Sequence, residues 1–218
     1  QLVVSATMRL PLVSTGLLLL LATVVMPGAD LFNGRDLAGW TYITLPTTMD
    51  IASVCTARAD GVIAATGKPV GFIATTATYH NYRLHAEWRW SGKPGNGGVL
   101  LHISSGPKDR AWPLCFQVQT KHGAAGDLLP MAGAAFAEPL TSAPGATAAR
   151  IRISTDSEKP AGEWNTCDLT CRGDTIEVVI NGVLQNRVTG ISVQEGKIGF
   201  QFEGTPFELR GVTVVGLD

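Results

Sequence analysis

Residues 162–182 read GEWNTCDLTCRGDTIEVVING, and they carry the clearest indication of the fold. Two runs within it, 166–171 and 175–180, alternate between small or apolar residues and polar residues on either side of a turn at Gly173. Alternation with a period of two is typical of a half-buried β-strand. The Asn-Gly pair at 181–182 opens another tight turn, because these residues accept the positive φ that hairpin turns need. The stretch therefore predicts consecutive β-hairpins.

The same alternation recurs along most of the chain, between breaks made of Gly, Pro, Asn and Asp. Convincing amphipathic helix patterns are absent from the sequence. We predict strands at residues 61–65, 82–90, 98–103, 116–121, 166–171, 175–180, 196–203 and 207–215. Short strands joined by regular turns predict an all-β fold, a two-sheet jelly-roll sandwich that forms a single domain.

The first part of the chain is typical of a targeting segment. A short basic start follows Met8, residues 10–26 are almost wholly apolar, and small residues up to Ala29 precede the first acidic residue. This layout predicts an upstream extension and signal peptide over residues 1–29, followed by a domain over 30–218. The apolar run is close to the length of a membrane span, so an uncleaved anchor is the alternative. Cleavage implies an exported protein, periplasmic or extracellular, with no membrane contact afterwards.

Composition argues against two classes of protein. Hydrophobic residues make up 45% of the chain and charged residues 16%, a balance that does not suit a disordered protein. The formal net charge is -1 at pH 7, and the sequence holds no long run of Lys or Arg. The chain therefore lacks the basic footprint of a nucleic-acid-binding protein, and we expect no nucleic-acid partner.

Export would permit disulfides, and the four cysteines allow three full pairings. These residues are Cys55, Cys115, Cys167 and Cys171. On one extended strand, Cys167 and Cys171 would have Cα atoms about 13 Å apart, beyond the reach of a disulfide. We therefore expect these two to be small core residues. We also expect Trp164 to fill the core and Asn165 to bond to the backbone.

Parity along the predicted strands separates an apolar face from a polar one. Along residues 82–90, aromatic and aliphatic side chains alternate with charged ones, including Glu87. The polar positions on the strands at 98–103, 116–121 and 196–203 are His102, Gln117, Gln119, Lys121, Gln201 and Glu203. If these strands pair in one sheet, the side chains form a concave surface that suits a polyhydroxylated ligand. A plain solvated face is the alternative explanation.

Seven short phrases, in this order, resemble one family of proteins. They are LFNGRDLAGW at residues 31–40, GNGGVLLHI at 95–103, WPLCFQVQ at 112–119, KHGAAGD at 121–127, GEWNT at 162–166, VVING at 178–182 and GKIGFQFEG at 196–204. The chain resembles the 3-keto-disaccharide hydrolase family, also described as 3-keto-glucoside lyase or hydratase domains and formerly a domain of unknown function. The resemblance covers residues 31–217 and implies a concanavalin A-like sandwich that acts on oxidised sugars.

One departure from the family pattern concerns its chemistry. The family commonly reads W-P-x-x-I-E-x-Q, where this chain has Gln117 in place of the glutamate. An amide can bind a hydroxyl or a carbonyl group, but it cannot accept a proton as a general base. The departure therefore bears on catalysis more than on the fold.

The resemblance implies a reaction that begins at a ketone on C3 of a sugar. The ketone acidifies the proton on C2, so one base can remove that proton while one group stabilises the C3 oxyanion. The resulting enediolate expels the group at C1, which needs one acid, and water then adds to the unsaturated sugar. The paired carboxylates of ordinary glycosidases are not needed.

We assign candidate roles to ten residues of this chain. The base is Glu203 or His102, and the oxyanion partner is Lys121 or His122. The substrate-binding candidates are Gln117, Gln119, Asp127, Gln201, Glu87 and Trp112, the last as an aromatic face for sugar C–H groups. For His122 and Asp127 the alternative is a plain turn residue. A divalent metal held by His102, Glu203 or neighbouring oxygen ligands would suit enediolate stabilisation, although no ligand spacing establishes it.

The expected partner is a carbohydrate, either a 3-keto-sugar or a glycoside. A separate sugar oxidoreductase would have to supply the ketone, because this chain has no dinucleotide-binding fingerprint. The alternative function is a non-catalytic carbohydrate-binding module on the same sandwich, which Gln117 favours. A third possibility is a structural domain of a bacterial envelope.

Overall fold

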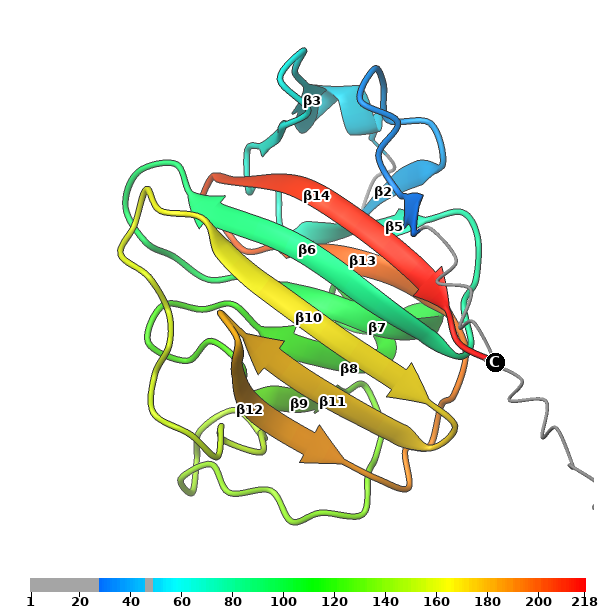
Figure 1. Cartoon of the computed structure of the whole chain (residues 1–218), viewed down its shortest axis with the longest axis vertical. Coiled ribbons are helices and arrows are strands. Elements are labelled where there is room, and N and C mark those ends of the chain that lie inside the picture. Colours follow the sequence, from blue (N-terminus) through cyan, green and yellow to red (C-terminus); the bar gives the residue numbers. More distant parts are fainter. Residues whose placement is uncertain (1–27, 46–48) are drawn as a thin grey trace, which may run out of the picture.

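The computed structural model describes residues 28–45 and 49–218. The predicted signal segment at residues 1–29 lies almost wholly outside the described residues. Two antiparallel sheets stack face to face and enclose the core between them (Figure 1). This arrangement confirms the predicted all-β sandwich.

One sheet has eight strands and the other has six. The first runs in the order β12-β11-β10-β6-β14-β4-β3, with β1 paired to β14; the second runs β2-β5-β13-β7-β8-β9. In the eight-stranded sheet the strands are β1 (Ala29–Asp30), β3 (Cys55–Ala57), β4 (Ile63–Ala65), β6 (Tyr82–Trp90), β10 (Asn165–Arg172), β11 (Thr175–Ile180), β12 (Val183–Val188) and β14 (Phe207–Gly216). In the six-stranded sheet they are β2 (Trp40–Thr44), β5 (Gly71–Thr75), β7 (Gly98–Asp109), β8 (Trp112–Gln119), β9 (Leu128–Met131) and β13 (Lys197–Phe202).

Helical structure within the described ranges is limited to one 3-10 turn, η1 (Ile51–Ser53). The Asp50 side chain caps it by accepting a hydrogen bond from the backbone N–H of Ala52 at 3.0 Å. Nowhere in residues 28–45 or 49–218 is there a helix long and apolar enough to cross a membrane.

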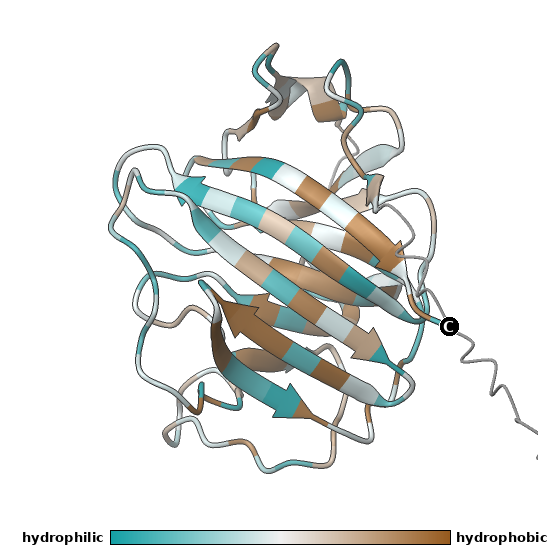
Figure 2. Ribbon diagram, in the orientation of Figure 1, coloured by the Kyte–Doolittle hydropathy of each residue, from teal (hydrophilic) through white to brown (hydrophobic). Residues whose placement is uncertain are grey.

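Side chains of alternating polarity explain why these segments form strands. Along β6, five residues point into the core and are at most 3% exposed: Tyr82, Leu84, Ala86, Trp88 and Trp90. The bands of hydrophilic and hydrophobic residues along the eight-stranded sheet show the same pattern (Figure 2). Because burying a large apolar side chain stabilises a fold by about 1.5–3 kcal/mol, this inward face holds the two sheets together.

The hairpins predicted from residues 162–182 are present. Strand β10 pairs with β11 in antiparallel register around the turn at Gly173, and β11 then pairs with β12. Cys167 and Cys171 are fully buried and free, as are the other two cysteines, which confirms the prediction for this pair. Asn165 accepts a hydrogen bond from the backbone N–H of Lys159 at 2.8 Å, as expected.

All eight predicted strands are present, with ends that differ by a few residues at most positions. Strands β6 and β11 match residues 82–90 and 175–180. Strand β5 is not predicted, because all five of its residues are buried and it carries no alternation. Strand β12 is also not predicted, because it begins with two exposed apolar residues.

The prediction that four strands share one polar face is wrong. Strand β6 belongs to the eight-stranded sheet, whereas β7, β8 and β13 belong to the six-stranded sheet. Since the core lies between the sheets, the outward side chains of β6 point away from those of the other three strands. Glu87 is therefore on the opposite side of the molecule from Gln117, Gln119 and Gln201.

Candidate functional site

A cleft of about 410 Å³ lies on the outer face of the six-stranded sheet. In Figure 1 this sheet is behind the eight-stranded one, so the cleft faces away from the viewer. Its polar lining includes Asn96, Arg110, Gln117, Gln119, Gln201 and Glu203, and Trp112, Leu129 and Met131 provide apolar surface. This volume is typical of sites for small molecules. We call it the amide cleft, because four of these six polar residues are amides.

Three glutamines form a hydrogen-bonded chain across the floor of the amide cleft. The Nε2 group of Gln117 donates to Oε1 of Gln119 at 3.0 Å and to Oε1 of Gln201 at 2.9 Å. We call these three residues the amide relay. Gln117 is only 2% exposed, and its own Oε1 is buried without a hydrogen-bond partner. An unsatisfied buried acceptor of this kind calls for a donor from a ligand or from water.

The sequence allows the relay to cross a strand because of one glycine. Gln117 lies on β8 and Gln201 on β13, and β7 runs between these two strands. A Cβ atom at Gly98 on β7 would stand 2.8 Å from Nε2 of Gln117, which is too close. The missing side chain at Gly98 therefore leaves the space through which Gln117 reaches Gln201.

Glu203 lies at the edge of the same cleft, directly after β13. Its Oε2 atom accepts a hydrogen bond of 2.6 Å from Nδ2 of Asn96. Burial raises the pKa of Glu203, while the charge of Lys121 and the hydrogen bond from Asn96 oppose that rise. The Oδ1 atom of Asn96 is a second buried acceptor without a partner. The arrangement thus combines a half-buried carboxylate with two unsatisfied amide oxygens.

Sequence comparison identifies the family. The sequence model of the 3-keto-alpha-glucoside-1,2-lyase-like domain matches residues 28–215. The chain belongs to this family. This confirms the resemblance, and the family is named for a lyase that acts on 3-keto-glucosides. No curated protein is similar to this lyase-like domain in sequence.

Solved structures agree with the sandwich fold. A candidate glycosyl hydrolase from Parabacteroides distasonis ATCC 8503 is 24% identical to this lyase-like domain, with a TM-score of 0.66 over 88% of this chain and 94% of the other. The carbohydrate binding module CBM66 from Bacillus subtilis is 13% identical, with a TM-score of 0.56 over 81% and 94%. The Bacillus licheniformis beta-glucanase is 11% identical, with a TM-score of 0.55 over 89% and 100%. At these identities the likeness establishes the fold alone.

Several predicted site residues of the lyase-like domain do lie in or beside the amide cleft. Gln117, Gln119, Gln201, Glu203 and Trp112 line it. Trp112 is half-buried at the start of β8, so part of its ring is available for contact. The structure therefore brings five of the ten candidates together, and their chemical roles stay predictions.

Lys121 and Asp127 lie beside a second hollow, of about 210 Å³, which shares Gln119 and Leu129 with the amide cleft. Asp127 is buried, and its Oδ1 accepts a hydrogen bond from the backbone N–H of Arg152 at 2.9 Å. Burial raises the pKa of Asp127, and this bond opposes the rise. The bond ties the loop at Arg152 to the start of β9, which is a structural contact. Lys121 is exposed, and its charge acts on Glu203.

His102 does not lie in the amide cleft, which corrects its predicted placement. Its backbone has φ of 53° within an irregular part of β7, where the register with β8 shifts between Leu101 and Ser105. Such a bulge turns the following side chains to the other face. The ring is fully buried, packs edge-on against Tyr82, and bonds through Nδ1 to the carbonyl of Val193 at 2.9 Å. Burial lowers the pKa of His102 and favours the neutral ring.

His122 and Glu87 are also placed outside the amide cleft. Nδ1 of His122 lies 3.1 Å from Oε2 of Glu158, a buried carboxylate that also accepts from the Trp90 indole. His122 therefore helps to anchor its loop. Glu87 accepts two hydrogen bonds from Arg210 on the outer face of the other sheet, at 2.9 and 2.7 Å. Both placements follow from pairings that parity along one strand does not reveal.

The suggested metal site is not assembled in the described structure. His102 turns into the core, whereas Glu203 faces the amide cleft. Within residues 28–45 and 49–218, no group of three or more His, Cys, Asp or Glu side chains is arranged to hold a metal ion. The donor set therefore gives the metal suggestion no support.

Asn96 and Arg110 also line the amide cleft, and neither was among the sequence candidates. Asn96 holds Glu203, and Arg110 reaches the cleft from the turn between β7 and β8. Asn96 occurs in the Gly95–Gly98 segment of a family phrase, so its position between glycines was a usable signal. Arg110 has φ of 54° at an irregular hairpin tip, and no periodic pattern marks it.

Proposed function

We propose that this lyase-like domain binds a 3-keto-glycoside in the amide cleft and cleaves its glycosidic bond by elimination and hydration. The observation that carries the proposal is the cluster of Glu203, Asn96 and Gln117. It offers one carboxylate of raised pKa next to two buried acceptors that lack donors. Sugar hydroxyls are donors of the required kind, and a carboxylate of raised pKa is a stronger base once it is ionised.

In the proposed reaction, Glu203 removes the proton from C2 of the bound keto-sugar. The electron pair of that C–H bond forms a double bond between C2 and C3, and the C3 oxygen becomes an enolate. The enolate then reforms the ketone, a double bond forms between C1 and C2, and the C1–O bond breaks. The leaving oxygen takes a proton from solvent. Water then adds its hydroxyl to C1 and releases its other proton to solvent, while the protonated Glu203 returns a proton to C2. The sum is one glycoside and one water converted to a free keto-sugar and an alcohol.

The other lining residues suit positioning. The positive charge of Lys121 acts on Glu203, so it supports negative charge that develops on the sugar. Trp112 also lines the cleft, and its aromatic ring suits packing against sugar C–H groups. His122 and His102 have no part in this scheme.

The proposal also assigns a place in a sequence of reactions. A 3-keto-glycoside arises by two-electron oxidation of the C3 hydroxyl, so a separate sugar oxidoreductase must act first. We further propose that the protein is exported, periplasmic or extracellular, on the basis of the apolar segment at residues 10–26.

The decisive experiment is incubation of the purified protein with an aryl 3-keto-glucoside and with the unoxidised aryl glucoside. We expect aryl alcohol to be released from the ketone only. The measurement is made with and without a chelator, which tests the metal suggestion independently. Absence of release from the ketone at high protein concentration would rule out the proposed lyase.

A second candidate function is non-catalytic carbohydrate binding. Gln117 favours it, because a neutral amide and not a carboxylate forms the floor of the cleft. Binding of either sugar without release of the aryl alcohol would support this alternative. Absence of both binding and release would contradict both functions.

A further inference from the structure

The direction of the hydrogen bonds in the amide relay bears on how a ketone would be recognised. A glutamine side chain has two N–H donors and one oxygen acceptor. Both donors of Gln117 are used, one on Gln119 and one on Gln201. The oxygens of Gln119 and Gln201 are therefore taken up by Gln117. Their own NH₂ groups make no hydrogen bond to other described residues and are available to the cleft.

The reverse arrangement of the relay is less favourable. If all three amides were flipped, the oxygen of Gln117 would accept two hydrogen bonds and its two N–H groups would be left unpaired in a buried position. The present arrangement leaves a single acceptor unpaired. Since each unsatisfied buried polar group costs about 1–3 kcal/mol, the arrangement with one unpaired group is favoured over the arrangement with two. Donor counting therefore fixes which way the relay points.

The relay gives the cleft floor a defined polarity. Gln119 and Gln201 present donors, whereas Gln117 presents an acceptor. A ketone oxygen only accepts, so it can bind to the donors and would be repelled by Oε1 of Gln117. A hydroxyl group donates as well, so it can satisfy that oxygen.

We propose that Gln201 donates to the C3 ketone oxygen of the substrate and that Gln117 holds Gln201 in this orientation. Gln201 and Glu203 are two residues apart at the end of β13, so they face the same side about 7 Å apart along the chain. That spacing fits a sugar whose C3 oxygen contacts the amide while its C2 proton contacts the carboxylate. The inference rests on the proposed function for the identity of the substrate.

The test measures binding without turnover. The probes are 1,5-anhydro-3-keto-glucitol and 1,5-anhydroglucitol, which lack a leaving group at C1 and differ only in the oxidation of C3. Isothermal titration to the full chain gives the ratio of their affinities. We expect the wild-type protein to bind the ketone, and the ratio of the two affinities, called the ketone preference, is the reference for the variants, because a hydroxyl can also accept from Gln201.

Gln117→Glu reverses the relay without removing any neighbour. A carboxylate, ionised at the pH of 8 used for the titration, only accepts. Gln119 and Gln201 would then turn their NH₂ groups towards it and present oxygens to the cleft. We expect the preference for the ketone to fall by about tenfold or to invert. A ketone preference that is unchanged or increased in Gln117→Glu overturns the inference, as does undetectable binding of the ketone by the wild-type protein.

Gly98→Ala tests the same hydrogen bond between Gln117 and Gln201 without changing either amide. Its Cβ would press on Nε2 of Gln117 from 2.8 Å and displace it from Gln201, so the ketone preference should fall as in Gln117→Glu. Gly92→Ala is the matched control, because a Cβ there meets nothing within 4 Å. If Gly98→Ala does not fold, Gln117→Glu decides alone. Release of aryl alcohol by the wild-type protein, together with a ketone preference that neither variant changes, would leave the proposed function standing and overturn only this inference.

Discussion

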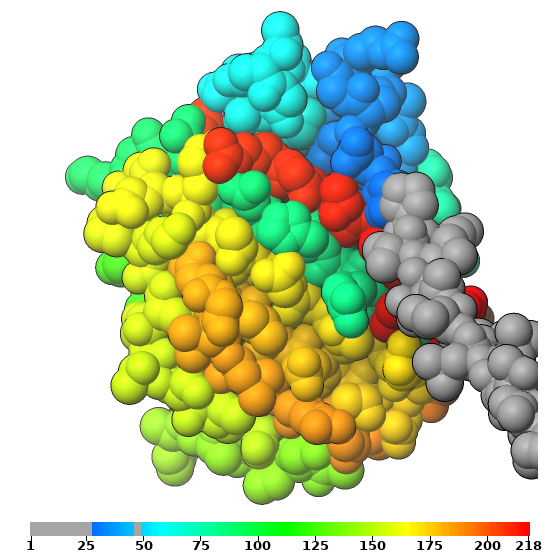
Figure 3. All heavy atoms as spheres, in the orientation of Figure 1, coloured from blue at the N-terminus to red at the C-terminus, as the bar shows by residue number. Residues whose placement is uncertain are grey.

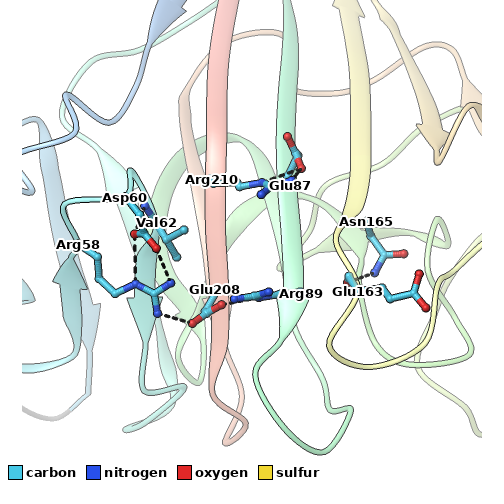
Figure 4. A network of polar contacts seen from close by, with 9 residues as sticks. All are labelled: Arg58, Asp60, Val62, Glu87, Arg89, Glu163, Asn165, Glu208 and Arg210. Atoms are coloured by element: carbon cyan, nitrogen blue, oxygen red, sulfur yellow. Dashed lines mark hydrogen bonds and ion pairs between the residues drawn. The ribbon is translucent and has the colours of Figure 1, made fainter.

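On the outer face of the eight-stranded sheet, charged side chains pair with one another, whereas on the outer face of the six-stranded sheet neutral amides leave oxygens without partners. On the first face, Glu208 of β14 bonds to Arg58 and to Arg89, and Glu87 of β6 bonds to Arg210 (Figure 4). Side chains from neighbouring strands cover this face in successive bands (Figure 3). These five charged groups satisfy each other.

Trp164 lies on this outer face of the eight-stranded sheet, which we call the paired face. This placement corrects its predicted place in the core. It is half-buried, and the guanidinium groups of Arg89 and Arg210 lie 4.6 and 4.1 Å from the ring centroid. Cation–π contacts of this kind hold an aromatic ring at a surface. The two arginines that pair with carboxylates thus also cover the tryptophan.

The amide cleft on the six-stranded sheet differs because some of its buried polar atoms have no hydrogen-bond partner. Gln117 Oε1 and Asn96 Oδ1 are buried acceptors that no described donor reaches. The contrast indicates that the number of polar residues on a sheet face does not reveal a site. What distinguishes the two faces is whether the polar atoms have partners within the fold.

Exchange of a carboxylate for an amide on each face should separate function from stability. Glu203→Gln removes the proposed base, so we expect kcat on an aryl 3-keto-glucoside to fall about 10²–10⁴-fold. The free energy of unfolding, from urea titration, should change by less than about 1 kcal/mol, because no ion pair is lost. Full activity in this variant would remove Glu203 as the base.

Glu208→Gln is the corresponding change on the paired face. The Glu208 side chain is only 9% exposed and contacts two arginines, so its neutralisation should lower the free energy of unfolding by about 1–3 kcal/mol. The two arginines are about one-third exposed, which keeps the loss below that of a fully buried pair. The kcat of the folded protein should be unchanged. A fall in kcat with no change in the free energy of unfolding would contradict the view that this face serves stability and the amide cleft serves function.

Trp112→Ala tests whether the aromatic ring that lines the amide cleft contributes to sugar binding. We expect binding of a keto-sugar to weaken by about 0.5–1.5 kcal/mol in titration calorimetry, as one aromatic contact is lost. Trp164→Ala serves as the control on the opposite face and should leave the sugar affinity unchanged. An equal effect from both variants would point to a general loss of structure.

The smallest expected effect is a shift in the pH profile. With Glu203 as the base, kcat/KM rises with pH as the carboxyl group loses its proton. The midpoint of this rise, the acid limb of the profile, lies above 4.5, the ordinary pKa of a glutamate, because burial raises the pKa of Glu203. Lys121→Met removes a positive charge that lowers the pKa of Glu203, so the acid limb should move to higher pH. A limb that stays in place or moves to lower pH would show that Lys121 does not act on the base.

Most of the fold and about half of the candidate site follow from the sequence. The alternation in residues 82–90 and 175–180 is local, so it predicted two strands with the bounds that the structure has. Gln117, Gln119, Gln201 and Glu203 were predicted to share a face, and they do. His102 was misplaced because one bulge reverses parity, and Glu87 because its strand joins the other sheet.

Eight of the strands, the family and the polar residues available to a site could be predicted from the sequence alone, because alternation, turn residues and motifs are properties of neighbours along the chain. Only the tertiary structure decided which sheet each strand joins, that Gly98 opens a path from Gln117 to Gln201, and that Asn96 holds Glu203. Strand order depends on contacts between distant segments, and hydrogen-bond partners depend on that order. The unpaired oxygens that mark the site therefore exist only in the folded chain.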